Sequence, residues 1–338
     1  MIDLGDTPFL EVDLDKVERN IARMQRYCDE HGLALLAHSK THKLPQIAAL
    51  QVAAGARAVV CQKLGEAEVM QAAGITDILI PYPLVGEAKV RRLAALAEHA
   101  RVTVAVDSPE VARGLAGIEV DVLVDCDTGF GRTGAQSVDD AAALAELVDG
   151  LPGLRFAGLM THPTPADGTF LAAARREIER RGLEVGRVGG GGTPGSLRTH
   201  THPELNELRV GVYVYGDCRT IAAGVIEPED CALRVRTTVV SRPTATRAIL
   251  DAGSKTLTSD DGPDGYGLVV EYPEARLVKV SEEHGHLELS GPGPALGEVV
   301  TVIPNHACVV SNLHDQVVVR RGGEAVEVWP IAARGKVR

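Results

Sequence analysis

Short apolar runs alternate with longer amphipathic stretches between residues 33 and 215. The runs resemble parallel strands that are buried on both faces, and the stretches between them show helical spacing of apolar residues. The predicted strands are 33–37, 57–61, 77–80, 102–106, 120–125, 155–160, 184–188 and 208–215. This alternation predicts a closed (β/α)8 TIM barrel. An open doubly wound sheet is the alternative, but the GxGxxG fingerprint after the first strand is absent.

The pattern differs on both sides of this region. Residues 9–14 alternate apolar with polar and predict a strand, followed by a helix with Val17, Ile21 and Met24 on one face. After about residue 231, short strands are separated by Gly, Pro and Asp turns, and no helical period is visible. We therefore expect a barrel domain over 14–232 and an all-β C-terminal domain made of 1–13 and 233–338.

Composition narrows the function. The net charge is −11, and there is no basic block, which argues against nucleic acid or an anionic membrane surface as partner. No apolar run approaches the roughly 20 residues that span a bilayer, and residues 1–6 lack the features of a signal peptide. We expect a cytoplasmic protein whose six cysteines, none in a CxxC motif, are free thiols.

Lys40 is the first candidate for chemistry. It lies in a polar cluster between the strand 33–37 and a helix that Pro45 opens. In α/β barrels this end of a strand carries the active site. We therefore predict that Lys40 holds a cofactor as an imine, whereas an ordinary surface lysine would be solvated.

A run of four glycines, 189–192, follows the seventh predicted strand. Glycines let backbone N–H groups converge on an anion, and loops at this position of a barrel often bind phosphate. A lysine, a phosphate site and a barrel together indicate pyridoxal phosphate (PLP). Other clusters near strand ends are 129–134 (GFGRTG), His162 and 209–211 (RVG).

Several motifs resemble those of the fold-type III PLP enzymes, the alanine racemase group, in the D-threonine aldolase and D-serine dehydratase branch. The similar stretches span nearly the whole chain in the expected order: 38–43 (HSKTHK), 131–134 (GRTG), 190–193 (GGGT), 281–285 (SEEHG), 304–308 (PNHAC), 312–315 (NLHD) and 329–330 (WP). The resemblance implies a barrel followed by a β domain and a homodimer. It also implies a small D-amino acid as substrate.

The resemblance also implies individual roles. Lys40 is the imine lysine and moves the α-proton, and Arg209 faces the nitrogen of the cofactor ring, which an arginine cannot protonate. Further cofactor contacts are implied for Arg132 near the phenolic oxygen, for His162 stacked on the ring, for Gly191, Gly192, Thr193 and Gly211 at the phosphate, and for Tyr213 or Tyr215 through a hydroxyl.

His306 and Cys308 are the predicted metal ligands. On a strand they would share one face, and an imidazole with a thiolate suits Zn²⁺. In the branch that the chain resembles, a divalent metal, Zn²⁺ or Mn²⁺, binds at these positions and can act on the substrate's β-hydroxyl as a Lewis acid. The predicted function is a PLP- and metal-dependent lyase acting on D-configured β-hydroxy-α-amino acids.

Whether C–C or C–O cleavage occurs stays open. Cys308 in place of an aspartate favours the dehydratases, and residues 163–170 lack the histidine that the aldolases carry there. Ala37 and Leu36 also differ from the residues that many relatives have at these positions, so the side chain of the preferred substrate is not determined. Two alternatives remain, a PLP-dependent racemase with a tyrosine as second base and a non-enzymatic PLP carrier. The β domain after residue 231 argues against the carrier.

Overall fold

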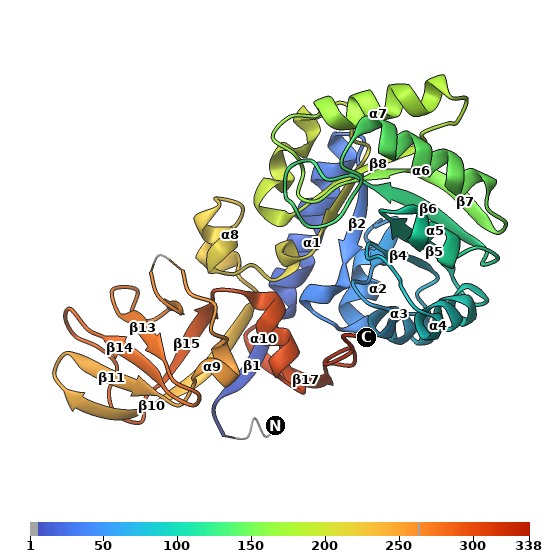
Figure 1. The fold of residues 1–338 in the computed structure, drawn as a ribbon. Coiled ribbons are helices and arrows are strands. Elements are labelled where there is room, and N and C mark those ends of the chain that lie inside the picture. Colours follow the sequence, from blue (N-terminus) through green and yellow to red (C-terminus); the bar gives the residue numbers. More distant parts are fainter. Residues whose placement is uncertain (1–5, 263) are drawn as a thin grey trace. The chain divides into compact units, whose positions relative to one another are not determined.

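A computed structural model describes residues 6–262 and 264–338, and its ribbon is drawn in Figure 1. The chain folds into two compact units. The barrel unit contains 23–40, 45–211 and 336–338, and the β-rich unit contains Met1–Ala22, Thr41–Leu44 and Val212–Gly335. This grouping differs from the expected boundaries, since residues 14–22 and 212–232 lie with the β-rich unit. Residues 1–5 of the expected β domain lie outside the described residues.

The barrel predicted from the sequence is confirmed. Eight parallel strands, β2 to β9, form a closed barrel in which β9 pairs back with β2. The strands are β2 (Ala34–His38), β3 (Ala58–Val60), β4 (Asp77–Ile80), β5 (Arg101–Val106), β6 (Val120–Asp125), β7 (Leu154–Met160), β8 (Arg187–Gly191) and β9 (Glu207–Val210). The helices between them are α2 (Pro45–Ala53), α3 (Leu64–Ala72), α4 (Glu87–Ala97), α5 (Pro109–Gly114), α6 (Val138–Gly150) and α7 (Thr169–Arg180).

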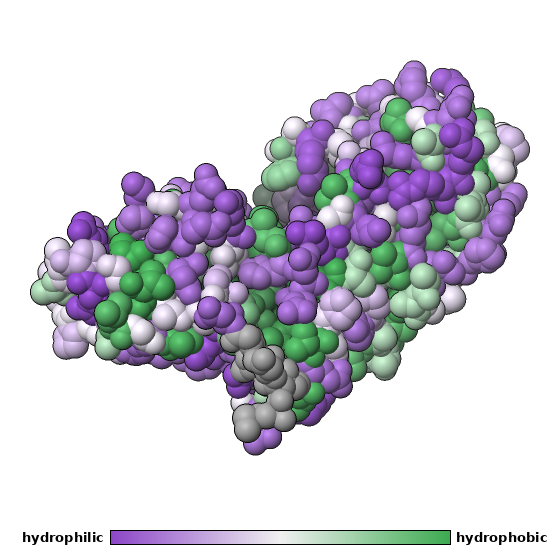
Figure 2. Space-filling model, turned by 90° about the horizontal axis from the view of Figure 1, so that it is seen from below, coloured by the Kyte–Doolittle hydropathy of each residue, from purple (hydrophilic) through white to green (hydrophobic). Residues whose placement is uncertain are grey.

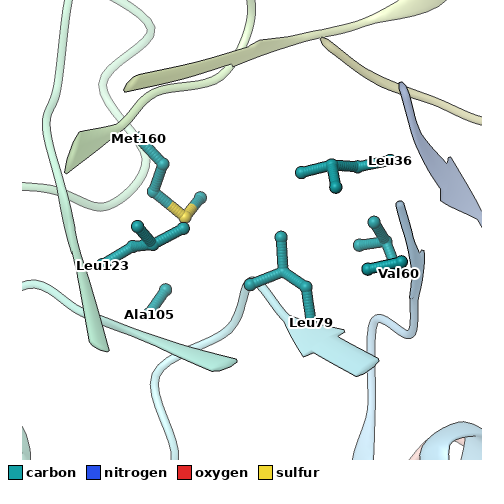
Figure 3. Packing of buried hydrophobic residues seen from close by; sticks show 7 residues of the cluster. Leu36, Val60, Leu79, Ala105, Leu123 and Met160 are labelled. Carbon is teal, nitrogen blue, oxygen red and sulfur yellow. The ribbon is translucent and has the colours of Figure 1, made fainter. Parts of the chain in front are cut away.

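Side chains fill the inside of the barrel. Leu36, Leu79 and Met160 come from three different strands and belong to one buried cluster, drawn in Figure 3. Glu207 is fully buried, and its carboxylate accepts from Arg187 Nε at 2.6 Å. A packed interior leaves no room for a ligand, so a barrel of this kind carries its chemistry on the loops that follow the strands.

The β-rich unit is built on one nine-stranded sheet, in the order β11-β14-β13-β12-β15-β10-β1-β16-β17. Its strands are β1 (Phe9–Asp13), β10 (Leu233–Thr244), β11 (Arg247–Leu250), β12 (Gly267–Val269), β13 (Arg276–Val280), β14 (Gly285–Glu288), β15 (Val299–Pro304), β16 (Gln316–Arg321) and β17 (Glu324–Pro330). The N-terminal strand β1 lies inside this sheet, antiparallel to β10 and parallel to β16. Helix α1 (Leu14–Glu30) follows β1 and buries Val17, Ile21 and Met24, as its pattern predicted.

The C-terminal region is β-rich, but it also contains short helices that the sequence pattern did not reveal. They are α8 (Cys218–Ala222), α9 (Ser254–Leu257) and α10 (Ala307–Leu313). Helices of one or two turns are too short to produce a recognisable apolar period. The expectation that His306 and Cys308 lie on a strand is therefore wrong. Strand β15 ends at Pro304, His306 caps α10, and Cys308 lies in its first turn.

Two barrel strands also differ from their predicted positions. The seventh was expected over 184–188 and is β8 (Arg187–Gly191), which includes three of the four glycines. The eighth was expected over 208–215 and ends at Val210, before a 3-10 turn, η3 (Val212–Val214). Glycine has no side chain and adds nothing to an apolar pattern, so that pattern could not place the end of β8.

The described surface mixes hydrophilic and hydrophobic residues. On the face shown in Figure 2, hydrophobic residues occur in separate patches among hydrophilic ones. Within residues 6–262 and 264–338, no helix has the length and apolar character that crossing a membrane requires. All six cysteines are free thiols, as expected.

Candidate active site

Lys40 lies directly after β2, in a 3-10 turn, η1 (Ser39–Thr41), and its side chain is partly exposed. Its backbone N–H donates to His38 Nδ1 at 3.4 Å, and Ser39 Oγ donates to the carbonyl of Val60 at 3.0 Å. Burial, and next the charge of Lys40, hold the pKa of His38 well below its usual value, so this ring is neutral. These contacts fix the backbone that carries Lys40 at the carboxyl end of β2.

Arg209 is buried on β9 and donates to the backbone carbonyl of Gly189 at 3.2 Å and to that of Thr161. A Cβ atom at position 189 would lie 2.7 Å from Arg209 Nη1, so the absence of a side chain there makes room for the guanidinium. Burial lowers the pKa of Arg209 to about 10, against the opposing charges of Asp125 and Glu207. Arg209 is thus a cation at neutral pH, with hydrogen-bond donors only.

We expect Gly189→Ala to destabilise the protein by about 1–3 kcal/mol, because the added methyl group would displace the Arg209 guanidinium. Gly195→Ala is the matched control, since a Cβ there would meet no atom within 4 Å. Replacing a glycine by alanine where the backbone is unstrained costs little stability. Urea unfolding of both variants measures the difference. Equal stability of the two variants would show that β8 tolerates side chains on this face.

The predicted phosphate residues have three different environments. Gly191 is the last residue of β8, and Gly192, at φ +100°, donates its N–H to the carbonyl of Arg209 at 3.0 Å. Thr193 is buried and opens the 3-10 helix η2 (Thr193–Thr201). The first N–H groups of a helix have no acceptor within it, and such a helix end attracts anions. The end of η2 therefore fits a phosphate group better than the amide of Gly192 does.

His162 follows β7 and lies against the glycine strand. Its Nδ1 is 3.4 Å from the position that a Cβ of Gly191 would take, and its ring meets Phe130 edge-on, with 5.7 Å between the ring centres. Burial, and then the charges of Arg209, Arg132 and Lys40 in that order, lower the pKa of His162 to about 4. The structure thus brings His162 within electrostatic reach of three cations that the sequence singled out.

The low pKa of His162 predicts a pH effect on stability. Below the usual value of 6.5 the unfolded chain takes up a proton on this ring, whereas the folded chain does so only near pH 4. Protonation therefore favours the unfolded state as the pH falls from 6.5 to 4. We expect the melting temperature of His162→Phe to fall less between pH 7 and pH 4.5 than that of the wild type.

Thermal unfolding across this pH range measures the effect. The control is His284→Phe, since His284 is exposed in the β-rich unit and its replacement should leave the wild-type slope unchanged. Parallel pH profiles for His162→Phe and the wild type would contradict the prediction.

The remaining cofactor candidates divide between the two units. Arg132 is exposed, and its guanidinium carbon lies 5.4 Å from the centre of the Phe130 ring in the barrel unit. Gly211 is buried and follows β9, also in the barrel unit. Tyr213 and Tyr215 are buried in the β-rich unit, where desolvation raises the pKa of Tyr215.

His306 and Cys308 lie side by side at the start of α10. Their mutual hydrogen bond is the main reason that the pKa of His306 is raised to about 8. Cys308 Sγ also lies 3.2 Å from Thr41 Oγ1. The N–H of Ala307, between the two residues, donates to the buried carboxylate of Asp217 at 3.1 Å, which fixes the backbone. The start of α10 therefore brings the two side chains together, although they do not lie on a strand as expected.

This pair fits a divalent metal by its chemistry, because imidazole nitrogen and thiolate sulfur are preferred zinc ligands. Within the described parts of the chain, no group of three or more His, Cys, Asp and Glu side chains is placed to hold a metal ion. A site built on the pair would have two protein ligands, which leaves positions for water and substrate.

Two contacts, one in each unit, were not foreseen from the sequence. Asp260 accepts a hydrogen bond from His306 at 2.6 Å. His202 pairs with Glu204 at 3.3 Å, and a Cβ at Gly168 would overlap the Glu204 carboxylate. The loop after β7 has no histidine between 163 and 170, but His202 lies beside this loop. No local motif marks either contact.

Comparison with known proteins decides the family. Residues 12–219 match the family described as "Alanine racemase, N-terminal domain", and residues 232–320 match the "Putative serine dehydratase domain". D-threonine aldolase of an Arthrobacter species is 36% identical, over 98% of this chain and 93% of its own length. The chain belongs to the fold-type III PLP enzymes, in the D-threonine aldolase and D-serine dehydratase branch. It is therefore a PLP-dependent lyase.

Other members of this family are similar over almost the whole chain. The 3-hydroxy-D-aspartate aldolase of Paracoccus denitrificans is 32% identical, over 98% of this chain and 92% of its own length. The crystal structure of D-threonine aldolase from Filomicrobium marinum superimposes with a TM-score of 0.91 at 35% identity, over 98% of this chain and 96% of that one. The D-threo-3-hydroxyaspartate dehydratase of Delftia sp. HT23 gives a TM-score of 0.86 at 29% identity, over 97% of both chains.

Proposed function

We propose that this protein is a PLP- and divalent-metal-dependent lyase that acts on D-configured β-hydroxy-α-amino acids. One observation carries the proposal. A chain of this family has Lys40 at the carboxyl end of a barrel strand, near Arg209 and His162, and an imidazole–thiolate pair at a helix start. The first group suits PLP and the second suits a metal.

The residues of the barrel unit have distinct tasks. When bound, PLP withdraws electrons from the substrate's α-carbon. Lys40 would hold the cofactor covalently through its amine, and the same amine, when free, would move the substrate's α-proton. Arg209 would donate a hydrogen bond to the ring nitrogen without protonating it, since a guanidinium does not give up its proton. The ring is then a weaker electron sink, and an additional electrophile is needed.

Thr193 at the start of η2 would bind the phosphate, together with Gly191 and Gly192, which precede it and have no side chains, and Gly211, which directly follows the neighbouring strand β9. Arg132 and His162 would contact the cofactor ring, because Arg132 and Lys40 both lie close enough to His162 to affect its pKa. A neutral His162, as its low pKa requires, would add no charge at the ring. Tyr213 would supply a hydroxyl to the phosphate.

His306 and Cys308 would hold the metal, which would be the additional electrophile. A divalent metal supplies a Lewis acid for the substrate's β-hydroxyl. Relatives support this assignment. Two solved variants of D-threo-3-hydroxyaspartate dehydratase replace a histidine and a cysteine that are two positions apart, and the cysteine variant is described as being in the metal-free form. His306 and Cys308 have the same spacing, and the thiolate favours Zn²⁺ over Mn²⁺.

The proposed cofactor and metal residues are compatible with two reactions. An aldolase breaks the bond between the α- and β-carbons, and a dehydratase expels the β-hydroxyl. Relatives of both kinds match this chain over 90% or more of its length. The deciding experiment incubates the PLP- and Zn²⁺-loaded protein with D-threonine, D-serine and 3-hydroxy-D-aspartate.

Glycine with an aldehyde identifies an aldolase, and a keto acid with ammonia identifies a dehydratase. The L-enantiomers are the controls and should not react. Conversion of D-alanine to L-alanine without either product would instead support a racemase and contradict the proposal.

We also infer that the protein acts as a homodimer, as the family resemblance implies, and that it works in the cytoplasm. We further infer that the β domain, as its family defines it, begins near residue 233, close to the start of the second family match. Size-exclusion chromatography with light scattering tests the dimer.

A further inference from the structure

Asp260 contacts a proposed metal ligand. Its Oδ2 lies 2.6 Å from Nδ1 of His306. An ionised carboxylate only accepts hydrogen bonds, so Nδ1 carries the proton in this contact. In a neutral imidazole the lone pair is then on Nε2, and a metal ion needs that lone pair. The contact therefore selects the tautomer of His306 that can bind a metal through Nε2.

Arg219 also lies close to both Asp260 and His306. Its guanidinium lies 3.3 Å from His306 Nδ1, but both groups are donors, so no hydrogen bond forms between them. The guanidinium instead pairs with Asp260 Oδ2 at 3.4 Å. This ion pair holds the Asp260 carboxylate facing the imidazole.

The backbone of Asp260 is held in place as well. Its N–H donates to Thr258 Oγ1 at 2.9 Å, and its carbonyl accepts from Asn305 Nδ2 at 2.9 Å. Asn305 is buried and immediately precedes His306. The carboxylate is thus tied to the same stretch of chain as the ligand that it touches, which distinguishes it from a surface carboxylate that meets a histidine by chance.

The position of the His306 ring depends on this carboxylate. The hydrogen bond between Ala307 N–H and Asp217 fixes the backbone after His306, and Asn305 is fixed before it. The main remaining freedom is rotation of the ring. A carboxylate that accepts a hydrogen bond from the other ring nitrogen of a metal-binding histidine sets both tautomer and orientation, and its loss typically weakens metal binding about 10- to 100-fold.

We propose that Asp260 is a positioning residue of the metal site: it orients His306 and holds its Nδ1 proton, and so raises the affinity of the His306–Cys308 pair for a divalent metal. The inference rests on the metal site proposed above and extends it. Asp260 is not proposed as a ligand.

The test compares Zn²⁺ affinity in metal-depleted, PLP-loaded protein by competition with a chromophoric chelator. Asp260→Asn keeps the size of the side chain and removes its charge, and we expect Zn²⁺ affinity to fall about 10- to 100-fold. Asp261→Asn makes the same charge change one residue away, at an exposed side chain, and should stay within about twofold of the wild type. Asp260→Ser replaces the asparagine variant if that variant does not fold.

Co²⁺ provides a second measurement, because a cobalt–thiolate contact gives a charge-transfer absorption band. At saturating Co²⁺, Asp260→Asn should keep this band, since Cys308 still binds the metal, and Cys308→Ala should lose it. A band that disappears in Asp260→Asn would overturn a purely positioning role.

The outcomes separate the two proposals. If the wild type binds neither Zn²⁺ nor Co²⁺, the metal site fails and the role of Asp260 fails with it. If the wild type binds Zn²⁺ and His306→Ala weakens binding, but Asp260→Asn binds as the wild type does, only the inference about Asp260 is overturned.

Discussion

Lys40→Ala should abolish the visible absorbance of the protein-bound cofactor and lower turnover of the D-configured substrate by at least ~10³-fold. The loss is large because one amine both holds the cofactor and moves the α-proton, and a general base alone contributes about 10²- to 10⁴-fold. The measurements are an absorbance spectrum after incubation with PLP and a steady-state assay with the best substrate of the panel.

Lys63→Ala is the matched control for this variant. Lys63 also follows a barrel strand, β3, and is partly exposed like Lys40, and its ammonium lies 3.5 Å from the centre of the Tyr82 ring. Its replacement should leave the cofactor spectrum unchanged. A Lys40→Ala protein that still shows the wild-type spectrum would remove the proposed cofactor site.

His306→Ala and Cys308→Ser should each lower Zn²⁺ affinity by more than ~100-fold and remove most of the activity at limiting metal. The loss of Zn²⁺ affinity should be larger than for replacement of a residue that is not itself a ligand, because each substitution removes one of the two protein ligands. Chelator treatment of the wild type should have the same effect on activity, and added divalent metal should restore it. Chelator competition and activity across a Zn²⁺ titration measure both.

The control is His284→Ala, at an exposed histidine of the same unit. This variant tests whether the loss of any histidine from the β-rich unit lowers Zn²⁺ affinity. Unchanged Zn²⁺ affinity in His306→Ala would place the metal elsewhere. Activity of the wild type that survives complete removal of metal would show that the reaction needs no Lewis acid.

Much of the barrel could be predicted from the sequence because its strands are buried on both faces. Strands β4 and β6 lie at the predicted residues, and Pro45 opens α2 as expected. The prediction was wrong where the apolar signal is weak. The seventh strand was placed too early because the glycines of β8 have no side chains, and α10 was missed because it has only seven residues.

The candidate site could be predicted only as separate groups. Lys40, His306 and Cys308 stand out because each lies in a short polar motif next to an apolar run. That Gly189 makes room for Arg209 could not be foreseen, since this contact joins two strands and leaves no trace in either. Gly192 was expected as a phosphate donor, but its N–H is bonded to the carbonyl of Arg209.

The sequence by itself determined the barrel, the place of Lys40 at a strand end, the glycine strand and the His306–Cys308 spacing. Each of these features is formed by residues that are close together in the sequence, so their order along the chain is enough to predict it. The tertiary structure alone decided that Asp260 meets His306 across 46 positions of the chain, and that His202 lies beside the loop after β7. The physical reason is that a hydrogen bond between distant residues depends on how the chain folds back, and no local pattern of polar and apolar residues records it.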